Sequence, residues 1–243
     1  MSAPTDRSVR PALTRLGRVE ARKMIDTRAA LWLLILTALS AVAAVLVGVL
    51  FDDASRDFGE TFVDAMLAVS VLLPIVPILL VTGEWSQRTA LGTFALVPIR
   101  ERVMAAKLLA LVALLAAVTL LCLGLAALGA AISGDGLGFS GAEAGDVILF
   151  ELLTLLFGFG IAAVLMNSPA AIVLNFVVPI VVGAIAAISA GVESVVSWVD
   201  PSAWSALTDS TAAEWDKIAT AALAWVVLPI AAGLVRLRRR DIA

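Results

Sequence analysis

The sequence predicts an all-α polytopic membrane protein with six transmembrane helices and both termini in the cytoplasm. Apolar residues make up 61% of the 243 residues and charged residues only 15%, whereas soluble domains are about half apolar and a quarter charged. The mean hydropathy is +1.04. Several apolar runs exceed the roughly 18 residues that indicate a membrane-spanning helix.

The distribution of positive charge predicts the orientation. Of the 17 Lys and Arg residues, all except Arg56 and Lys217 lie in the N-terminal segment, a central loop or the C-terminal tail. Loops rich in Lys and Arg are retained in the cytoplasm. We therefore predict a multi-pass protein of a cytoplasmic (plasma) membrane, N-in and C-in. The strong preference for arginine over lysine suits a GC-rich bacterial genome.

The N-terminal segment, 1–28, contains an amphipathic stretch at 11–26. On a helical wheel its apolar residues share one side, interrupted by Glu20 and Lys23, and three arginines lie opposite. This pattern is typical of a helix in the membrane interface, whereas 1–10 fits a disordered basic tail better. The candidates for contact with lipid are Arg15, Arg18, Arg22 and Trp32.

A six-span transmembrane domain is predicted at 29–235, followed by a basic cytoplasmic tail at 236–243. The first apolar run is too long for the core of a signal peptide, so we interpret it as an anchor. Pro74 and Pro77 predict a kink in the second span. The expected spans are 29–51, 61–83, 108–132, 146–166, 170–190 and 217–235.

Polar side chains inside the spans are candidates for a substrate path. Ionisable residues in spans are costly and usually face a bundle interior or a watery cavity. Asp64 and Glu151 are each expected near the outer end of their span, where a side chain can also reach the interface. Asn175 is the third candidate, and its alternative role is a hydrogen bond between helices.

An outer segment at 191–216 is longer than a simple turn requires. It is acidic and contains Trp198, Trp204 and Trp215, which suit the membrane interface. Two interpretations remain open, a surface loop with short helices and a lid that dips back into the membrane.

The central loop, 84–107, carries four cations and two acids between two long apolar runs. Good helix formers and the absence of proline predict a short helix over 84–96. Pro98 predicts a corner, because it disfavours a helical Val97 and suits the first turn of a new helix. The loop is either a solvated charged loop or the place where the chain contacts a soluble partner.

This loop resembles that of permease subunits of type-2 bacterial ABC exporters. The shared features are a glutamate closing the second span, a leucine-rich turn, a proline, a basic pair and a lysine opening the third span. Arg88 departs from the pattern, because the family more often has glycine there. The matching positions are Glu84, Arg88, Thr89, Thr93, Phe94, Ala95, Leu96, Pro98, Arg100, Arg102 and Lys107.

The resemblance covers nearly the whole chain and implies an exporter subunit. It implies an elbow helix at the N-terminus, an ABC ATPase on a partner chain that binds ATP and Mg, and a second permease chain in a homodimer or a dimer with a related subunit. The predicted contacts to the ATPase are Glu84, Arg88, Thr89, Leu91, Phe94, Leu96, Arg100 and Arg102.

The residue inventory argues against catalysis on this chain. A P-loop needs Gly-Lys followed by Ser or Thr, but Lys23, Lys107 and Lys217 precede Met, Leu and Ile. The chain has no histidine and one cysteine, Cys122, which argues against histidine catalysis and a multi-cysteine zinc site. We expect no cofactor and no metal on this chain, and membrane lipids rather than nucleic acid as further partners.

Two other classes of function stay open. One is a secondary transporter or channel that uses Asp64 and Glu151, for which ionisable residues near the membrane midplane would be expected; the sequence places none there. The other is a non-transporting membrane anchor or assembly factor. The substrate and the direction of transport are not encoded in a readable pattern.

Overall fold

The computed structural model describes residues 12–51, 57–86, 100–134, 138, 140–208 and 213–239. Within these ranges every regular element is a helix, in agreement with the all-α prediction. The elements are α1 (Leu13–Asp26), α2 (Arg28–Phe51), α3 (Phe58–Ser70), α4 (Ile75–Ser86), α6 (Arg100–Ser133), α7 (Gly141–Leu165), α8 (Ser168–Ala186), α9 (Ala190–Val196), the 3₁₀ helix η1 (Pro201–Leu207), α10 (Trp215–Ala222), the π-helix η2 (Leu223–Val227) and α11 (Leu228–Arg239).

Six of the helical stretches are long and apolar enough to cross a membrane, which confirms the predicted number of spans. In three of them the helix extends by several residues beyond the apolar run from which it was predicted. The stretches are Arg28–Phe51, Phe58–Glu84, Glu101–Ser133, Glu143–Leu165, Ser168–Ala186 and Trp215–Arg239.

The second span is broken, as its prolines predict. It consists of α3 and α4, and the residues between them form turns with hydrogen bonds from Leu72 and Leu73 N–H to the Val69 carbonyl. Pro74 closes this turn. Pro77 lies in the first turn of α4, where the missing N–H leaves no intrahelical bond unmade.

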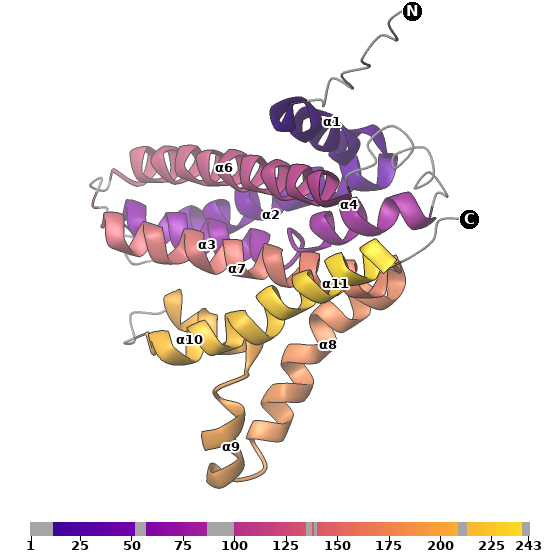
Figure 1. Cartoon of the computed structure of the whole chain (residues 1–243). Coiled ribbons are helices and arrows are strands. Elements are labelled where there is room, and N and C mark those ends of the chain that lie inside the picture. The colour runs from indigo at the N-terminus through magenta and orange to yellow at the C-terminus, as the bar shows by residue number, and fades with distance from the viewer. Residues whose placement is uncertain are drawn as a thin grey trace, which may run out of the picture.

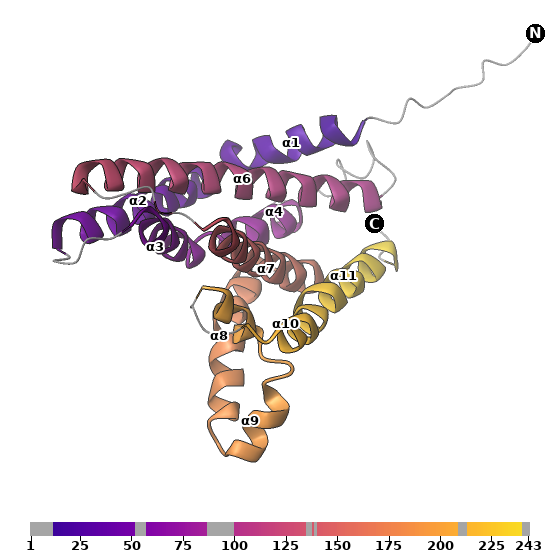
Figure 2. The same ribbon diagram turned by 90° about the vertical axis from the view of Figure 1, so that its left-hand side faces the viewer.

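Figure 1 shows α2, α3, α6 and α7 running side by side, and α11 packed along α7. Helix α8 diverges from this bundle and carries α9 at its far end, as both Figure 1 and Figure 2 show. Helix α1, the end of α4, the start of α6 and the end of α11 gather at one end. The described parts of the segments predicted to be cytoplasmic therefore lie together in space.

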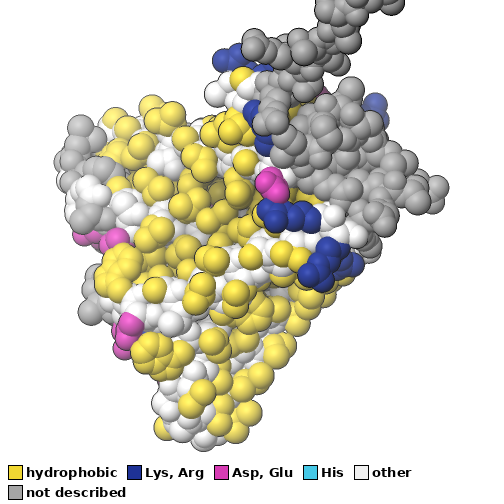
Figure 3. Space-filling view, in the orientation of Figure 1, with side chains coloured by type: hydrophobic (Ala, Val, Ile, Leu, Met, Phe, Trp, Pro, Cys, Tyr) yellow, Lys and Arg dark blue, Asp and Glu magenta, His cyan; other side chains and the backbone are white. Residues whose placement is uncertain are grey.

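Hydrophobic and charged side chains occupy different parts of the surface, as they occupy different parts of the sequence. Hydrophobic side chains cover the face in Figure 3. Lys and Arg lie towards the end where α6 begins and α11 ends, and most Asp and Glu lie towards the opposite end. The side of the membrane that each end faces remains a prediction from the positive-inside rule.

The outer segment 191–216 contains two short helices, α9 and η1. Trp204 of η1 is buried and makes an edge contact with Phe157 of α7, with ring centroids 5.9 Å apart. The Trp225 indole donates a hydrogen bond to the Val199 carbonyl at 2.6 Å. Phe157 is about 24 Å along α7 from Gly141, so η1 packs against α7 well away from its first turn, and both interpretations of the segment stay predictions.

Candidate functional site: a buried charge network beside the central loop

Four charged side chains from three helices meet where the central loop leaves and re-enters the bundle. Lys107 of α6 lies 2.8 Å from Glu20 of α1 and 3.4 Å from Glu84 of α4. Lys23 of α1 lies 2.7 Å from Glu20 and 2.6 Å from Glu84. Lys107 also donates to the Leu80 carbonyl at 2.9 Å. We call Glu20, Lys23, Glu84 and Lys107 the charge network.

The network is largely removed from solvent. Glu20, Glu84 and Lys107 are 4%, 6% and 2% exposed. Two cations face two carboxylates, so the charges balance, and each buried charge has at least two partners among the other groups. Buried charges are tolerated when they are paired and hydrogen-bonded.

The sequence of α1 explains why this helix joins the network. Glu20 and Lys23 are three residues apart and therefore lie on one face of the helix. Met24, on the same side, is 5% exposed. Gly17 permits a close approach to α6, because a Cβ there would lie 2.9 Å from Leu109 Cδ2. Helix α1 is thus held by apolar contact and by ion pairs together.

The environment of Lys23 favours its charged form. Burial of the side chain acts to lower the pKa, but hydrogen bonds and attraction from Glu20 and Glu84 outweigh it and raise the pKa of Lys23 above its ordinary value. Lys23 therefore stays protonated at neutral pH and contributes a full positive charge to the network.

The remaining predicted contacts of the loop are only partly visible. Glu84 belongs to the network, and Arg102 lies in the first turn of α6. Arg100 is the first residue of α6. The other candidates, Arg88, Thr89, Leu91, Phe94 and Leu96, fall outside the described residues, as does the rest of the helix predicted over 84–96 beyond Ser86.

The last helix reaches the same end of the bundle. Arg238 of α11 forms an ion pair with Glu101 of α6 at 2.6 Å. Arg236 donates to the Val164 carbonyl near the end of α7. The two sides of the central loop are therefore connected to the N-terminal and the C-terminal helices of the chain.

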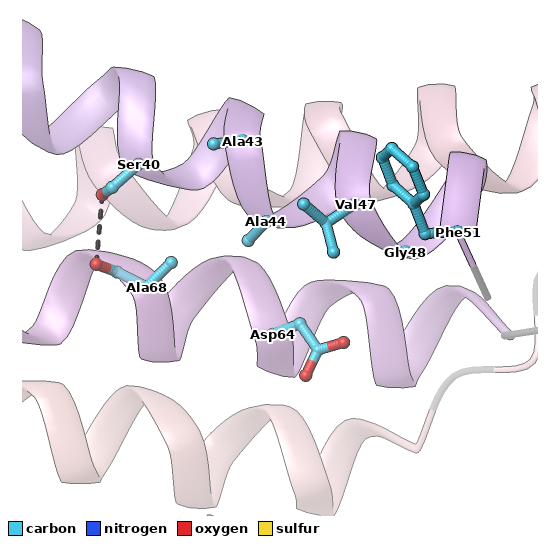
Figure 4. Close-up of a pocket in the computed structure, with 8 residues that line it drawn as sticks. All are labelled: Ser40, Ala43, Ala44, Val47, Gly48, Phe51, Asp64 and Ala68. Carbon is cyan, nitrogen blue, oxygen red and sulfur yellow. Dashed lines mark hydrogen bonds between the residues drawn. The ribbon is translucent and has the colours of Figure 1, made fainter.

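Asp64 lies elsewhere, in an open groove between α2 and α3. The groove has a volume of about 610 Å³, and Figure 4 shows the Asp64 carboxylate beside small side chains of α2. The Ser40 hydroxyl donates to the Ala68 carbonyl at 3.0 Å and ties the two helices together at one end of the groove. The lining residues are Ser40, Ala43, Ala44, Val47, Gly48, Phe51, Asp64 and Ala68.

Glu151 occupies a different environment from the one its position in the apolar run suggests. Helix α7 begins at Gly141, five residues before the expected start of the span, so Glu151 is the eleventh of 25 residues. Its side chain is 0% exposed. The side chain is therefore enclosed by the helix bundle, and its depth in a membrane stays a prediction.

Asn175 is 5% exposed on α8, and its Oδ1 atom has no hydrogen-bond partner. It lies against α7, because a Cβ on Gly158 would be 3.3 Å from Asn175 Oδ1. Gly158 is about 10 Å along α7 from Glu151. Asp64, Glu151 and Asn175 are thus distributed over the bundle rather than gathered in one pocket.

The lipid-interface candidates lie on the outside of the molecule. Arg15, Arg18 and Arg22 are exposed along α1, opposite the face that carries the charge network. Trp32 is 63% exposed near the start of α2. These positions agree with a role at lipid head groups, which stays a prediction.

Three members of the network were not among the predicted site residues: Glu20, Lys23 and Lys107. The signal was present for the first two, because they interrupt the apolar side of an amphipathic helix. A charged pair on the packed side of a helix indicates a partner of opposite charge in the fold. The sequence does not show that Glu84 and Lys107 are the partners, because this depends on how α4 and α6 pack against α1.

No group of three or more His, Cys, Asp or Glu side chains within the described ranges is arranged to hold a metal ion.

No protein-family model matches the sequence, and no curated protein matches it. The likeness to ABC exporter permeases therefore rests on the sequence pattern of the central loop and on the order of the spans.

Proposed function

We propose that this chain is the permease subunit of an ATP-driven bacterial exporter, coupled to a separate ATPase through the 84–107 loop. The observation that supports this function best is the charge network. It joins α1, the end of α4 and the start of α6 at the two ends of the loop. ATP hydrolysis on a soluble partner can move the spans only through a rigid contact of this kind.

In this function the loop would bind in a groove on the ATPase. Leu91, Phe94 and Leu96 would supply apolar anchors, as helix-in-groove contacts do, and Arg88 and Arg100 would fix the register by charge. The network would then transmit the displacement of the loop to α1 and α6 together. Because α1 packs on α6 and carries exposed arginines on its other face, α1 would lie between lipid and the coupling loop in this exporter.

A dimer is part of the same proposal. Of the six spans, α8 and α2 have the smallest buried shares, 11% and 17%. Ile180 and Ile188 of the α8 region are 69% and 72% exposed. In the proposed exporter, a second permease chain covers the α8 face and the substrate path lies between the two chains.

The test is co-purification with an ABC ATPase co-expressed from the same genome, combined with transport in inside-out vesicles. Phe94→Ala and Arg88→Glu are expected to lower transport at least tenfold or to release the ATPase, because a buried aromatic anchor typically contributes about 2 kcal/mol or more. Leu120→Ala, at an exposed apolar side chain of α6, is the control and should behave like wild type. If both loop variants keep the ATPase and transport at the wild-type rate, the loop is not the coupling element.

One observation favours the second candidate, a secondary transporter or channel. Glu151 lies within the membrane bundle, where proton relays and coupling-ion sites are built. The same vesicles separate the two functions. Transport that requires ATP and survives a protonophore supports the exporter, whereas transport that requires a proton gradient and no ATPase supports the second candidate. A chain that assembles with partners but transports under neither condition is a membrane assembly factor.

A further inference from the structure

Glu151 is the most deeply enclosed acid that the structure describes. It lies about 15 Å from the start of α7, a helix about 37 Å long. One turn before it and one turn after it, Val147 and Leu155 are each 1% exposed. Both belong to the apolar cluster formed with α3 and α6, which includes Phe62, Met66 and Val118. The carboxyl group is therefore surrounded by hydrocarbon rather than by solvent.

Neither carboxyl oxygen of Glu151 has a hydrogen-bond partner among the described residues. On α6, the buried thiol of Cys122 is near enough to interact with Glu151 electrostatically. One turn before Cys122, the hydroxyl of Thr119 is also buried and unpaired. An ionised carboxylate in such a place would have neither a counter-charge nor a donor.

No cation in the described part of the chain compensates Glu151. None of the charged groups on the described elements packed against α7 donates a hydrogen bond to Glu151. Lys107 is occupied by the charge network, about 22 Å along α6 from Cys122. Asp64 lies in the groove between α2 and α3. Helix α7 itself carries Glu143 and Asp146 in its first two turns, and α8, η1 and η2 carry no charged residue. The remaining charged residues on the neighbouring helices are Glu60 on α3, Glu84 on α4, Glu101 and Arg102 at the start of α6, and Arg236, Arg238 and Arg239 at the end of α11.

We infer that Glu151 is a proton-binding site in the membrane interior, and that the closed bundle holds it as a neutral carboxylic acid at neutral pH. An isolated ionised carboxylate is so unfavourable in an apolar medium that the group neutralises instead. Binding of the proton is thus coupled to closure of the α6–α7 contact. Separation of these helices would hydrate Glu151 and release the proton, and the hydroxyl of Thr119 would be among the first polar atoms that entering water meets.

This inference concerns the closed bundle and does not require the exporter function. Infrared spectroscopy tests it on the purified full chain in a detergent without ester groups. At pH 7.5 the wild type should show the C=O stretch of a protonated carboxylic acid, with the expected shift in D₂O. Glu151→Gln should remove this band, and Asp64→Asn should leave it in place. Unfolding at the same pH should abolish the band, because an ordinary glutamate, with a pKa of about 4.3, is then ionised.

Two results would overturn the inference. One is the absence of a protonated carboxyl band from the folded wild type at pH 7.5; the other is a band that Glu151→Gln leaves unchanged. Because the wild-type band and its loss on unfolding are measured without any variant, the test holds even if Glu151→Gln folds poorly. Thermal unfolding gives a further check. A Glu151 that is neutral in the folded state and ionised in the unfolded state binds a proton on folding, so the wild type should lose stability relative to Glu151→Gln between pH 5.5 and pH 7.5, whereas an ionised Glu151 predicts the same relative stability at both pH values.

Discussion

The Lys107 ammonium lies 2.8 Å from the Glu20 carboxylate across 87 residues of sequence. Removing one partner of a buried pair leaves the other charge uncompensated, which typically costs about 3–5 kcal/mol. Lys107→Met should therefore destabilise the protein by about 3 kcal/mol in reversible denaturation from detergent micelles.

The control for this variant is Lys217→Met, which removes an ion pair with Glu214 near the surface and should change stability little. Combining Lys107→Met with Glu20→Gln should recover part of the loss, because the double variant no longer buries an unpaired carboxylate on α1. Equal stability of Lys107→Met and wild type would mean that the network contributes nothing to folding.

The raised pKa of Lys23 predicts that the folded protein loses stability at alkaline pH. A group whose pKa is higher in the folded state contributes stability that is complete below its unfolded pKa and is lost as the pH rises through the folded value. The loss should thus begin above about pH 10.4, the ordinary pKa of lysine. Thermal unfolding between pH 9 and pH 11.5 should show the midpoint falling.

A matched variant identifies the source of this loss. Arginine remains protonated throughout the range, so Lys23→Arg should retain more of its neutral-pH midpoint at pH 11 than the wild type does. The chain has no histidine and no tyrosine, which keeps the alkaline titration simple. If Lys23→Arg and wild type lose stability in parallel, Lys23 is not the responsible group.

The packing of α11 on α7 depends on Gly233. A Cβ at this position would lie 2.5 Å from Ala163 Cβ and 2.9 Å from the Ala163 carbonyl oxygen. Because a backbone cannot yield as a long side chain can, Gly233→Ala should destabilise by about 1–3 kcal/mol. Gly183→Ala on α8 is the control, since nothing lies within 4 Å of the added methyl, and it should be neutral or slightly stabilising. A neutral Gly233→Ala would show that the two helices are not in this contact.

Cysteine labelling tests the predicted orientation of the bundle in the membrane. In a Cys122→Ala background, a membrane-impermeant maleimide added to intact cells should label Ser140→Cys, which precedes α7. It should not label Ser86→Cys at the end of α4 until the cells are opened. Labelling of Ser86→Cys alone from outside would reverse the predicted topology and move the charge network to the outer face.

The sequence by itself determined the number of spans, the break in the second one and the grouping of cations at one end. These features are local, because a chain in lipid must satisfy its backbone hydrogen bonds within each helix and long apolar runs with prolines are visible directly. The turn before α8 is equally local: Asn167 caps that helix by accepting from the Ala170 N–H at 3.0 Å, and Pro169 follows in the first turn.

Only the tertiary structure decided what the charged residues do. In the sequence, Glu20 and Lys23 only interrupt the apolar side of an amphipathic helix. In the structure, α1 packs on α6, and this packing brings Glu20 and Lys23 within ion-pair distance of Lys107 and Glu84. For Glu151 the sequence left a substrate path, helix packing and the membrane interface open, and the packing of α7 against α3 and α6 buries its side chain. Helical periodicity shows which residues share a face, but the partner of a face is set by the packing of helices distant in sequence, and for a buried charge that partner decides between an ion pair and a bound proton.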